Sequence, residues 1–181
     1  MNSLRVLITA VLLGVAFAAA GVAHSTSAAP AASGSVHRCY NIQIMVRPYR
    51  TGPGAAGHVH LLYRVHNLWG GACTLYGYPG MLLLNRYFYS LPTHVKRSSG
   101  MGQRRLVTLD SNHDGYFEVA YSDVPSGPGP CRAAPYLMIT IPNANLPIVT
   151  YSHTNHVGPN PFAPCRGQID VGPIESTARF L

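Results

Sequence analysis

The sequence is poor in charge, and particularly in acidic side chains. Charged residues make up 10% of its 181 positions, against roughly 25% in an average globular domain. The six acidic residues are scattered along the chain: Asp110, Asp114, Glu118, Asp123, Asp170 and Glu175. A hydrolase of the glycosidase kind needs two carboxylates placed to act as acid and as base or nucleophile. The scattered set therefore argues against that class of enzyme.

Several catalytic signatures are missing as well. The chain has no G-x-S-x-G elbow, no H-E-x-x-H metal motif and no Walker loop, which mark common hydrolases and nucleotide-binding enzymes. It also has no closely spaced C-x-x-C pair, so a metal site built from its four cysteines is not expected. We therefore expect no enzymatic activity and no cofactor.

The beginning of the chain has the features of a secretory signal peptide over residues 1–23. Arg5 supplies a short basic start, and residues 6–23 are almost wholly apolar or small. Small residues that permit cleavage follow. The alternative is a retained membrane anchor, because the apolar segment is barely long enough to cross a bilayer. The richness in alanine and glycine favours cleavage, after which no transmembrane segment is expected.

The rest of the chain divides simply. Residues 24–35 are small, polar and proline-containing, which predicts a flexible leader. Residues 36–181 have the length of a single domain with a sizeable core. No cysteine precedes Cys39, so a lipid-modified cysteine at the end of the signal is excluded.

The four cysteines all follow the expected signal peptide, which indicates disulfide bonds in an exported chain. Four cysteines allow three pairings, and we favour the two sequential pairs, Cys39–Cys73 and Cys131–Cys165. Each pair closes a loop of the same length, which contributes roughly 4 kcal/mol in the chain-entropy model. With the thiols bridged, a cysteine nucleophile is not expected.

Glycine and proline are abundant, with 18 and 15 residues, and no long helical pattern is present. The clearest strand is residues 58–67, in which apolar and polar side chains alternate. One face carries Val59, Leu61, Tyr63 and Val65, and the other carries His58, His60, Leu62, Arg64 and His66. This alternation predicts one face on a core and one toward water.

Further strands are predicted at residues 41–47, 81–89, 104–110, 116–123, 136–142 and 167–173, and Cys73 is expected to end or begin another short strand. Residues 143–165 are expected to form a long connection. Many short strands separated by turns are typical of an all-β protein, and we expect an antiparallel Ig-like β-sandwich stapled by two disulfides. A closed barrel is the alternative.

The order of these features resembles a family of small secreted proteins and lipoproteins of unknown function that is common in actinobacteria. The resemblance rests on Cys-x-Leu-x-Gly-Tyr-Pro-Gly at residues 73–80, and four other segments support it: 55–67, 106–110, 131–142 and 165–173. It implies an exported β-sandwich with two disulfides and supplies no activity. The chain lacks the acylated cysteine of the lipoprotein members, which favours free secretion over anchoring.

Histidines are the first candidate site. His58 and His60 are two residues apart on the predicted strand, so their side chains share a face. Such a pair can hold Zn²⁺ or Cu²⁺ if a neighbouring element supplies a third ligand. The alternatives are an ordinary polar face of the sandwich and a pH-responsive surface.

The second candidate site is residues 96–105, called here the basic segment. Lys96 and Arg97 precede a Gly/Ser-rich tip, and Arg104 and Arg105 follow it. If the segment is a hairpin, its cations share one end of the sandwich and favour an anionic partner, such as a phosphate-rich envelope glycan or acidic lipid headgroups. Nucleic acid is not expected as the partner of an exported chain. Solubility alone is the simpler explanation.

Aromatic residues are the third candidate. Trp69 lies in a glycine-flanked loop, where it either plugs the end of the sandwich or contacts a ligand. Tyr87 and Tyr89 share a face of the predicted strand 81–89, and we expect one face of that strand to be core. Sugar or peptide stacking is the alternative.

These observations predict an exported, non-catalytic binding or structural module of the cell envelope or the extracellular medium. Its partner is expected to be an anionic envelope component or another exported protein. A histidine-based metal binder is the alternative function, and an enzyme of unrecognised type is a more remote one.

Overall fold

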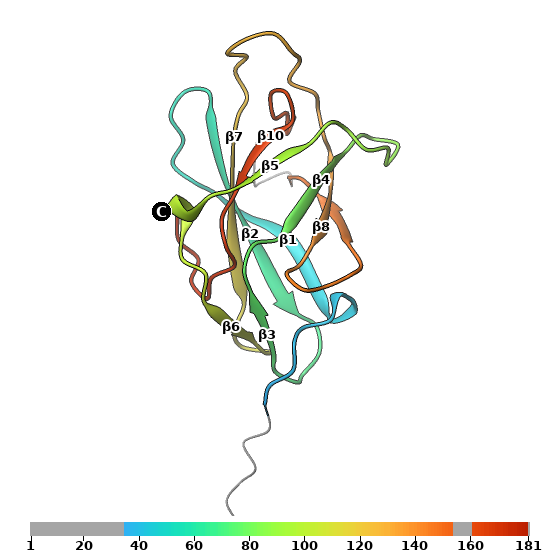
Figure 1. The fold of residues 1–181 in the computed structure, drawn as a ribbon, viewed down its shortest axis with the longest axis vertical. Coiled ribbons are helices and arrows are strands. Elements are labelled where there is room, and N and C mark those ends of the chain that lie inside the picture. The colour runs from blue at the N-terminus through green and yellow to red at the C-terminus, as the bar shows by residue number, and fades with distance from the viewer. Residues whose placement is uncertain (1–34, 154–160, 181) are drawn as a thin grey trace, which may run out of the picture. The chain divides into compact units, whose positions relative to one another are not determined.

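The computed structural model describes residues 35–153 and 161–180, so the expected signal peptide and nearly all of the leader lie outside the described residues. The described chain is all-β, as predicted (Figure 1). Its strands are β1 (Ile44–Thr51), β2 (His58–Asn67), β3 (Cys73–Tyr76), β4 (Gly80–Leu84), β5 (His94–Arg97), β6 (Leu106–Leu109), β7 (Gly115–Ser122), β8 (Tyr136–Thr140), β9 (Ile148–Tyr151) and β10 (Gln168–Val171). Two short 3₁₀ helices, η1 (Asn41–Gln43) and η2 (Ser99–Met101), complete it.

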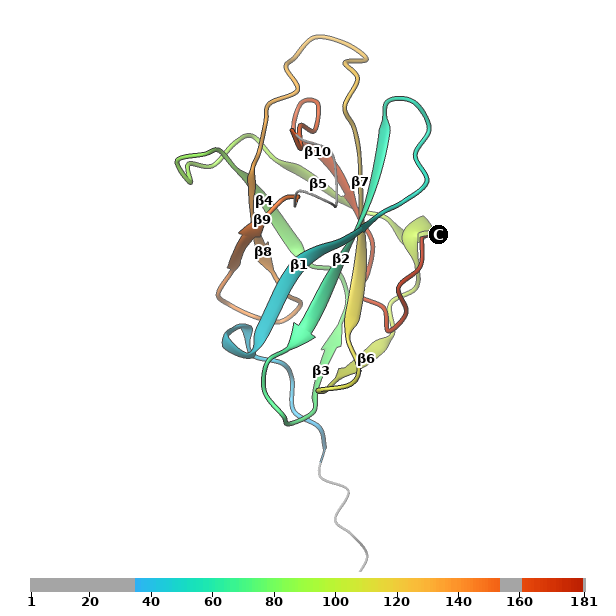
Figure 2. The same cartoon turned by 180° about the vertical axis from the view of Figure 1, so that it is seen from behind.

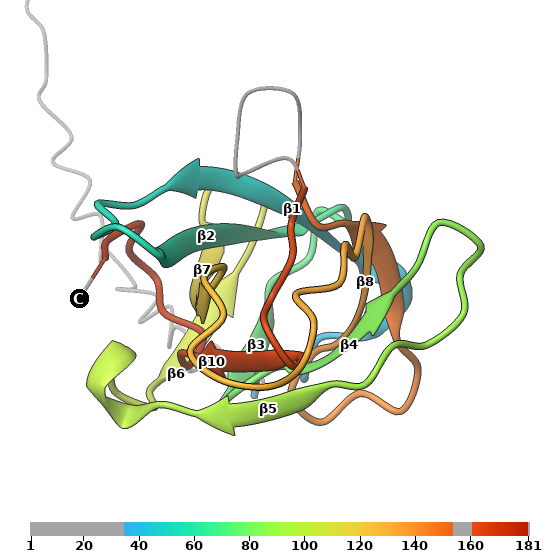
Figure 3. The same cartoon turned by 90° about the horizontal axis from the view of Figure 1, so that it is seen from above.

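The strands form three sheets in a β-sandwich, as predicted. The largest has the order β1-β2-β7-β10-β5, the second β4-β8-β9, and the smallest β3-β6. The pairs are antiparallel apart from β10–β5, which is parallel. Figures 1 and 2 show the sheets from front and back. Seen from above (Figure 3), the five-stranded sheet curves from β1 to β5, and β4 and β8 lie across its open side.

The core follows the inner face of β2. Leu61, Tyr63 and Val65 are buried there, as the alternation predicted. The ring of Tyr63 stacks on that of Phe117 in β7, with the centroids 5.3 Å apart, and its hydroxyl donates a hydrogen bond to the Ser152 carbonyl. The outer face of β2 is less exposed to solvent than predicted, since Leu62 on that face is only 1% exposed.

Several predicted boundaries were wrong for local reasons. The first predicted strand begins at residue 44 rather than 41, because 41–43 form η1. The predicted strand 81–89 ends at Leu84, because the Asn85 side chain organises a turn there. Its Oδ1 accepts hydrogen bonds from the backbone N–H groups of Tyr87 and Tyr89, at 2.8 and 3.0 Å. The predicted connection 143–165 contains β9.

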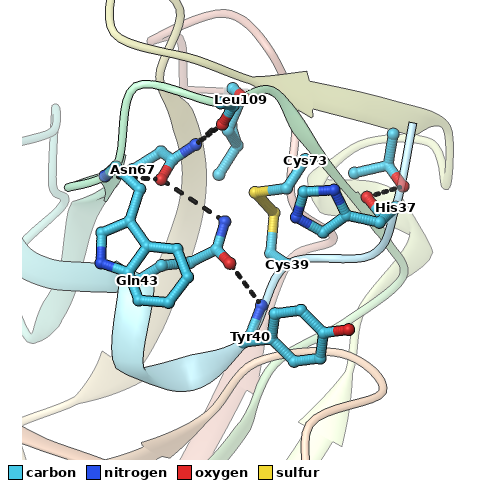
Figure 4. Close-up of a disulfide and its surroundings, with 10 residues drawn as sticks. His37, Cys39, Tyr40, Gln43, Asn67, Cys73 and Leu109 are labelled. Atoms are coloured by element: carbon cyan, nitrogen blue, oxygen red, sulfur yellow. Dashed lines mark hydrogen bonds between the residues drawn. A yellow bond between two sulfur atoms is a disulfide. The ribbon is translucent and has the colours of Figure 1, made fainter.

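Both predicted disulfides are confirmed, Cys39–Cys73 and Cys131–Cys165. The first ties the segment before η1 to β3 (Figure 4). The Cys39 N–H donates to the Thr74 carbonyl at 3.0 Å, and the Thr74 N–H donates to the His37 carbonyl at 2.9 Å. The second joins the connection after β7 to the turn before β10, where Cys131 and Cys165 form an antiparallel bridge. Each disulfide thus fixes an otherwise irregular segment.

Among residues 35–153 and 161–180, no helix is long and apolar enough to cross a bilayer.

Candidate functional site

The basic segment is a crossover between sheets and not the hairpin considered from the sequence. β5 pairs with β10 in the five-stranded sheet, whereas β6 pairs with β3 in the smallest sheet. The chain between them passes through η2. Met101 is buried, and the Gln103 N–H donates to Glu175 Oε1 at 3.1 Å, so the segment is anchored at its middle.

The four cations of the basic segment all lie on the surface. Lys96 is weakly paired, with its Nζ 3.7 Å from Asp170 Oδ1. Arg105 donates to the neutral side chain of Gln103 at 3.0 Å. Within the described parts of the chain, no ion pair is formed by Arg97, Arg104 or Arg105. Three guanidinium groups are therefore left to contact an external anion.

Trp69 is 49% exposed, so it does not plug the end of the sandwich. The loop that carries Trp69 is held in place by the side chain of Asn67, a buried amide that lies between Gln43 and Leu109 (Figure 4). Asn67 Oδ1 accepts from the Trp69 N–H at 3.0 Å, and Asn67 Nδ2 donates to the Gly71 carbonyl at 2.7 Å. A fixed loop thus presents a half-exposed indole.

The two predicted metal ligands lie in different surroundings. His58 is exposed, whereas His60 is half-buried and its Nδ1 contacts the buried carboxylate of Glu118 at hydrogen-bond distance. A polar cavity of about 180 Å³ includes both histidines and Asp170 in its lining. In the described residues, however, no three His, Cys, Asp or Glu side chains are arranged to hold a metal ion.

A second charged cluster lies at the other end of β2. Asp114 accepts a hydrogen bond from Arg64 Nε at 2.6 Å, and its other oxygen lies 2.7 Å from Nδ1 of His66. Burial alone would raise the pKa of the Asp114 carboxyl, but the hydrogen bonds and charges of His66 and Arg64 outweigh it and lower the pKa. This cluster joins β2 to the start of β7.

The residues after β4 expose three aromatic rings, so the expectation of a core face there was wrong. Tyr87, Phe88 and Tyr89 are all more than half exposed. Phe88 has a left-handed backbone with φ of 63°, and its ring stacks on that of Tyr136, with centroids 4.4 Å apart. The turn organised by Asn85 explains the difference, because it ends the strand before these residues.

A glycine motif in the chain lacks the context of a nucleotide site. Residues 52–57 spell G-x-G-x-x-G, but they connect the antiparallel strands β1 and β2. The dinucleotide fingerprint requires a strand followed by a helix, whose N-terminus binds the pyrophosphate. No such helix follows in the described chain, so the motif supports no nucleotide site.

Sequence reasoning missed a cavity of about 260 Å³ beside the Cys131–Cys165 disulfide. Arg132 and Arg166 both belong to its lining, and each directly follows one of the bridged cysteines. The sequence did contain one sign of this cavity, namely that an arginine follows each of the two cysteines. Once the disulfide pairing is known, it places the two arginines beside one bridge, where both line the same cavity.

A family model described as a domain of unknown function, DUF4232, matches residues 43–175, which is well over half of the chain. No curated protein and no solved structure matches the chain. The match spans β1 to the end of β10, and it includes the basic segment, Trp69 and both Cys-Arg pairs.

Proposed function

The chain belongs to the DUF4232 family, a domain of unknown function, and we propose that it is an exported, non-catalytic binding module whose basic segment binds phosphate groups of a cell-envelope component. The observation that carries the proposal is the set of three arginines, Arg97, Arg104 and Arg105, which are exposed and form no ion pair within the described residues. Guanidinium groups bind phosphate oxygens in a bidentate manner.

The way the basic segment is fixed supports this role. Met101 is buried and Gln103 is bonded to Glu175, so the backbone between η2 and β6, which carries the exposed Arg104 and Arg105, is anchored. Arg97 is fixed separately, at the end of β5 beside β10. A surface that is ordered before binding loses less conformational entropy when a partner binds. The formal net charge of the full chain is +7, and removal of residues 1–23 takes away only Arg5, so a positive charge remains that adds a long-range attraction for anions.

Export is supported by the two disulfides and by the sequence of residues 1–23. Disulfides form and persist in oxidising compartments and are rare in the cytosol. The signal-like segment at the start of the chain gives a route to such a compartment. A secreted or envelope-associated module is the location that satisfies both features.

The proposal is tested by cosedimentation with two phosphate sources, a polyol-phosphate polymer coupled to beads and vesicles that contain phosphatidylglycerol. We expect salt-sensitive binding to at least one of them, reduced about tenfold or more by the double substitution R104Q/R105Q. The matched control is R38Q/R47Q, which removes the same charge from exposed arginines elsewhere. Equal loss in both variants would show attraction by net charge alone, and the proposal would be wrong.

A histidine-based metal site is the alternative function, and the surroundings of His60 weigh against it. Its Nδ1 is already engaged by Glu118, which leaves Nε2 as the remaining ligand atom of that ring. Tight, stoichiometric retention of zinc or copper by the purified protein, lost in His58→Ala, would favour the alternative.

A further inference from the structure

The cavity beside the second disulfide is open to solvent on one side and is lined by three segments that are far apart in the sequence. Its lining includes Leu83 and Leu91 from the end of β4 and the segment after it, Arg132 from the connection after β7, and Pro164 and Arg166 from the turn before β10. In Figure 1 these three segments lie in the upper half of the view. The cavity shares no residue with the basic segment.

The two Cys-Arg pairs are held firmly in place. Besides the disulfide, the Arg166 N–H donates to the Pro130 carbonyl at 3.0 Å, and the Gly167 N–H donates to the Pro164 carbonyl at 3.1 Å. The turn is tightly packed, since a Cβ at Gly167 would overlap the Pro92 carbonyl oxygen. A Cβ at Gly129 would lie 2.9 Å from Arg166 Cγ, so glycine there leaves space for the arginine stem.

Arg166 itself has a strained backbone. Its φ is 56°, in the left-handed region that glycine and asparagine adopt at lower cost than other residues. A long, β-unbranched cation at such a position is retained at an energetic cost to the fold. This cost of the left-handed backbone is explained if the Arg166 guanidinium group binds a ligand at the cavity.

The chemistry of the lining is one-sided. Leu83, which is 2% exposed, and the side chains of Leu91 and Pro164 give apolar walls. Arg132 and Arg166 are the charged members, and no acidic side chain of the described chain belongs to the lining. Both arginines are exposed, and Arg166 also lines the polar cavity that includes Asp170, where its Nη2 donates to the neutral Gln168 Oε1 at 3.2 Å. Among the described residues neither arginine forms an ion pair, so both positive charges are available to an anion.

We propose that this cavity binds a small anionic amphiphile, with its carboxylate or phosphate held by Arg132 and Arg166 and its short apolar chain lying against Leu83, Leu91 and Pro164. Arginine forks suit either anion, and apolar walls favour a hydrocarbon tail. The volume of about 260 Å³ lies below the roughly 300–1,000 Å³ of sites for drug-sized ligands. The ligand is therefore a short-chain compound or the end of a longer chain.

Isothermal titration of the whole protein with butanoate, hexanoate, octanoate and hexyl phosphate tests the proposal. We expect affinity to rise about fourfold with each added methylene until the cavity is filled. Hexanol and hexylamine, which have the same tail with a neutral or positive head, are expected to bind at least about tenfold more weakly than hexanoate. Equal binding of hexylamine, or no saturable binding of any anion at concentrations on the order of 10 mM, would overturn the proposal.

Two variants locate the site. Arg132→Gln removes a charge, and Arg166→Gly removes a charge while relieving the left-handed backbone, so its thermal midpoint should be maintained. Each is expected to weaken octanoate binding about tenfold or more. The control R104Q/R105Q removes two cations of the basic segment and should leave octanoate affinity unchanged, which separates this proposal from the phosphate partner. Unchanged affinity in both cavity variants would show that the amphiphile binds elsewhere.

Discussion

At the scale of single residues, Asp114 joins two separate parts of the fold by charge. Its carboxylate contacts Arg64 and His66 from β2 while it lies just before β7. These are charge-assisted hydrogen bonds, which are stronger than bonds between neutral groups. Because Asp114 is half-buried, water screens them less than it screens the exposed Lys96–Asp170 pair.

We predict that Asp114→Asn lowers the free energy of unfolding at pH 7 by about 1–2 kcal/mol. The folded-state pKa of Asp114 is lowered, so its stabilisation is present above the ordinary carboxyl pKa of about 3.9 and is lost as pH falls through the folded value. Urea unfolding of both proteins at several pH values should therefore show the difference shrinking below about pH 4. The exposed Asp123→Asn is the control, and a difference independent of pH would contradict the prediction.

Asn67 is the residue that fixes the position of Trp69. Its buried amide forms hydrogen bonds with the Trp69 N–H, the Gly71 carbonyl and the Gln43 side chain. We predict that Asn67→Leu destabilises the protein by about 2–3 kcal/mol, because four polar groups lose a hydrogen bond, among them the buried side chain of Gln43. The sole tryptophan should also show lower fluorescence anisotropy. Asn112→Ala, at an exposed position, should change neither quantity, and an unchanged anisotropy in Asn67→Leu would show that the loop is held by other contacts.

At the scale of elements, strands with one buried face could be predicted, whereas strands with no buried residue could not. β2 has the predicted bounds because its alternation reports burial between β1 and β7. β5 and β9 were missed, since β5 is exposed along its whole length and β9 is at most half-buried. Such a strand is held mainly by backbone hydrogen bonds to a neighbouring strand, and its own residues do not show which strand that is.

The candidate site shows the same limit. The exposure of the basic segment followed from its composition, but its position between two sheets depended on β5 pairing with β10, some 70 residues later. The cavity was out of reach because its walls come from three distant segments. The hydrophobic pattern of a single segment does not show which distant segments lie beside it. The disulfide between the two Cys-Arg pairs indicated only that two of the three segments lie together.

The turn before β10 is the element most sensitive to a single methyl group. Gly167 has φ of 68°, and its Cα faces the Pro92 carbonyl. We predict that Gly167→Ala destabilises the protein by more than about 2 kcal/mol, through backbone strain and overlap together. Gly71→Ala is the matched control, because nothing lies near its added Cβ, and it should stay within about 0.5 kcal/mol of the parent protein. Thermal unfolding measures both; equal midpoints would show that the turn can move.

At the scale of the whole molecule, the two disulfides close loops of equal length but have different consequences. Each has a sequence separation of 34 residues, so the chain-entropy model assigns about 4 kcal/mol to each. The double variant C39A/C73A frees the segment beside β3, whereas C131A/C165A frees the frame of the cavity. Their stabilities should therefore fall alike while their binding properties differ.

We predict that C39A/C73A, measured below its unfolding temperature, binds octanoate with the affinity of the parent protein. C131A/C165A should bind at least about tenfold more weakly, because Arg132 and Arg166 are then no longer held together and ordering them reduces the binding free energy. Intact mass under denaturing, non-reducing conditions verifies that each variant retains its other disulfide, and titration at matched fractions of folded protein gives the affinities. Equal loss in both variants would mean that global stability, and not the frame of the cavity, controls binding.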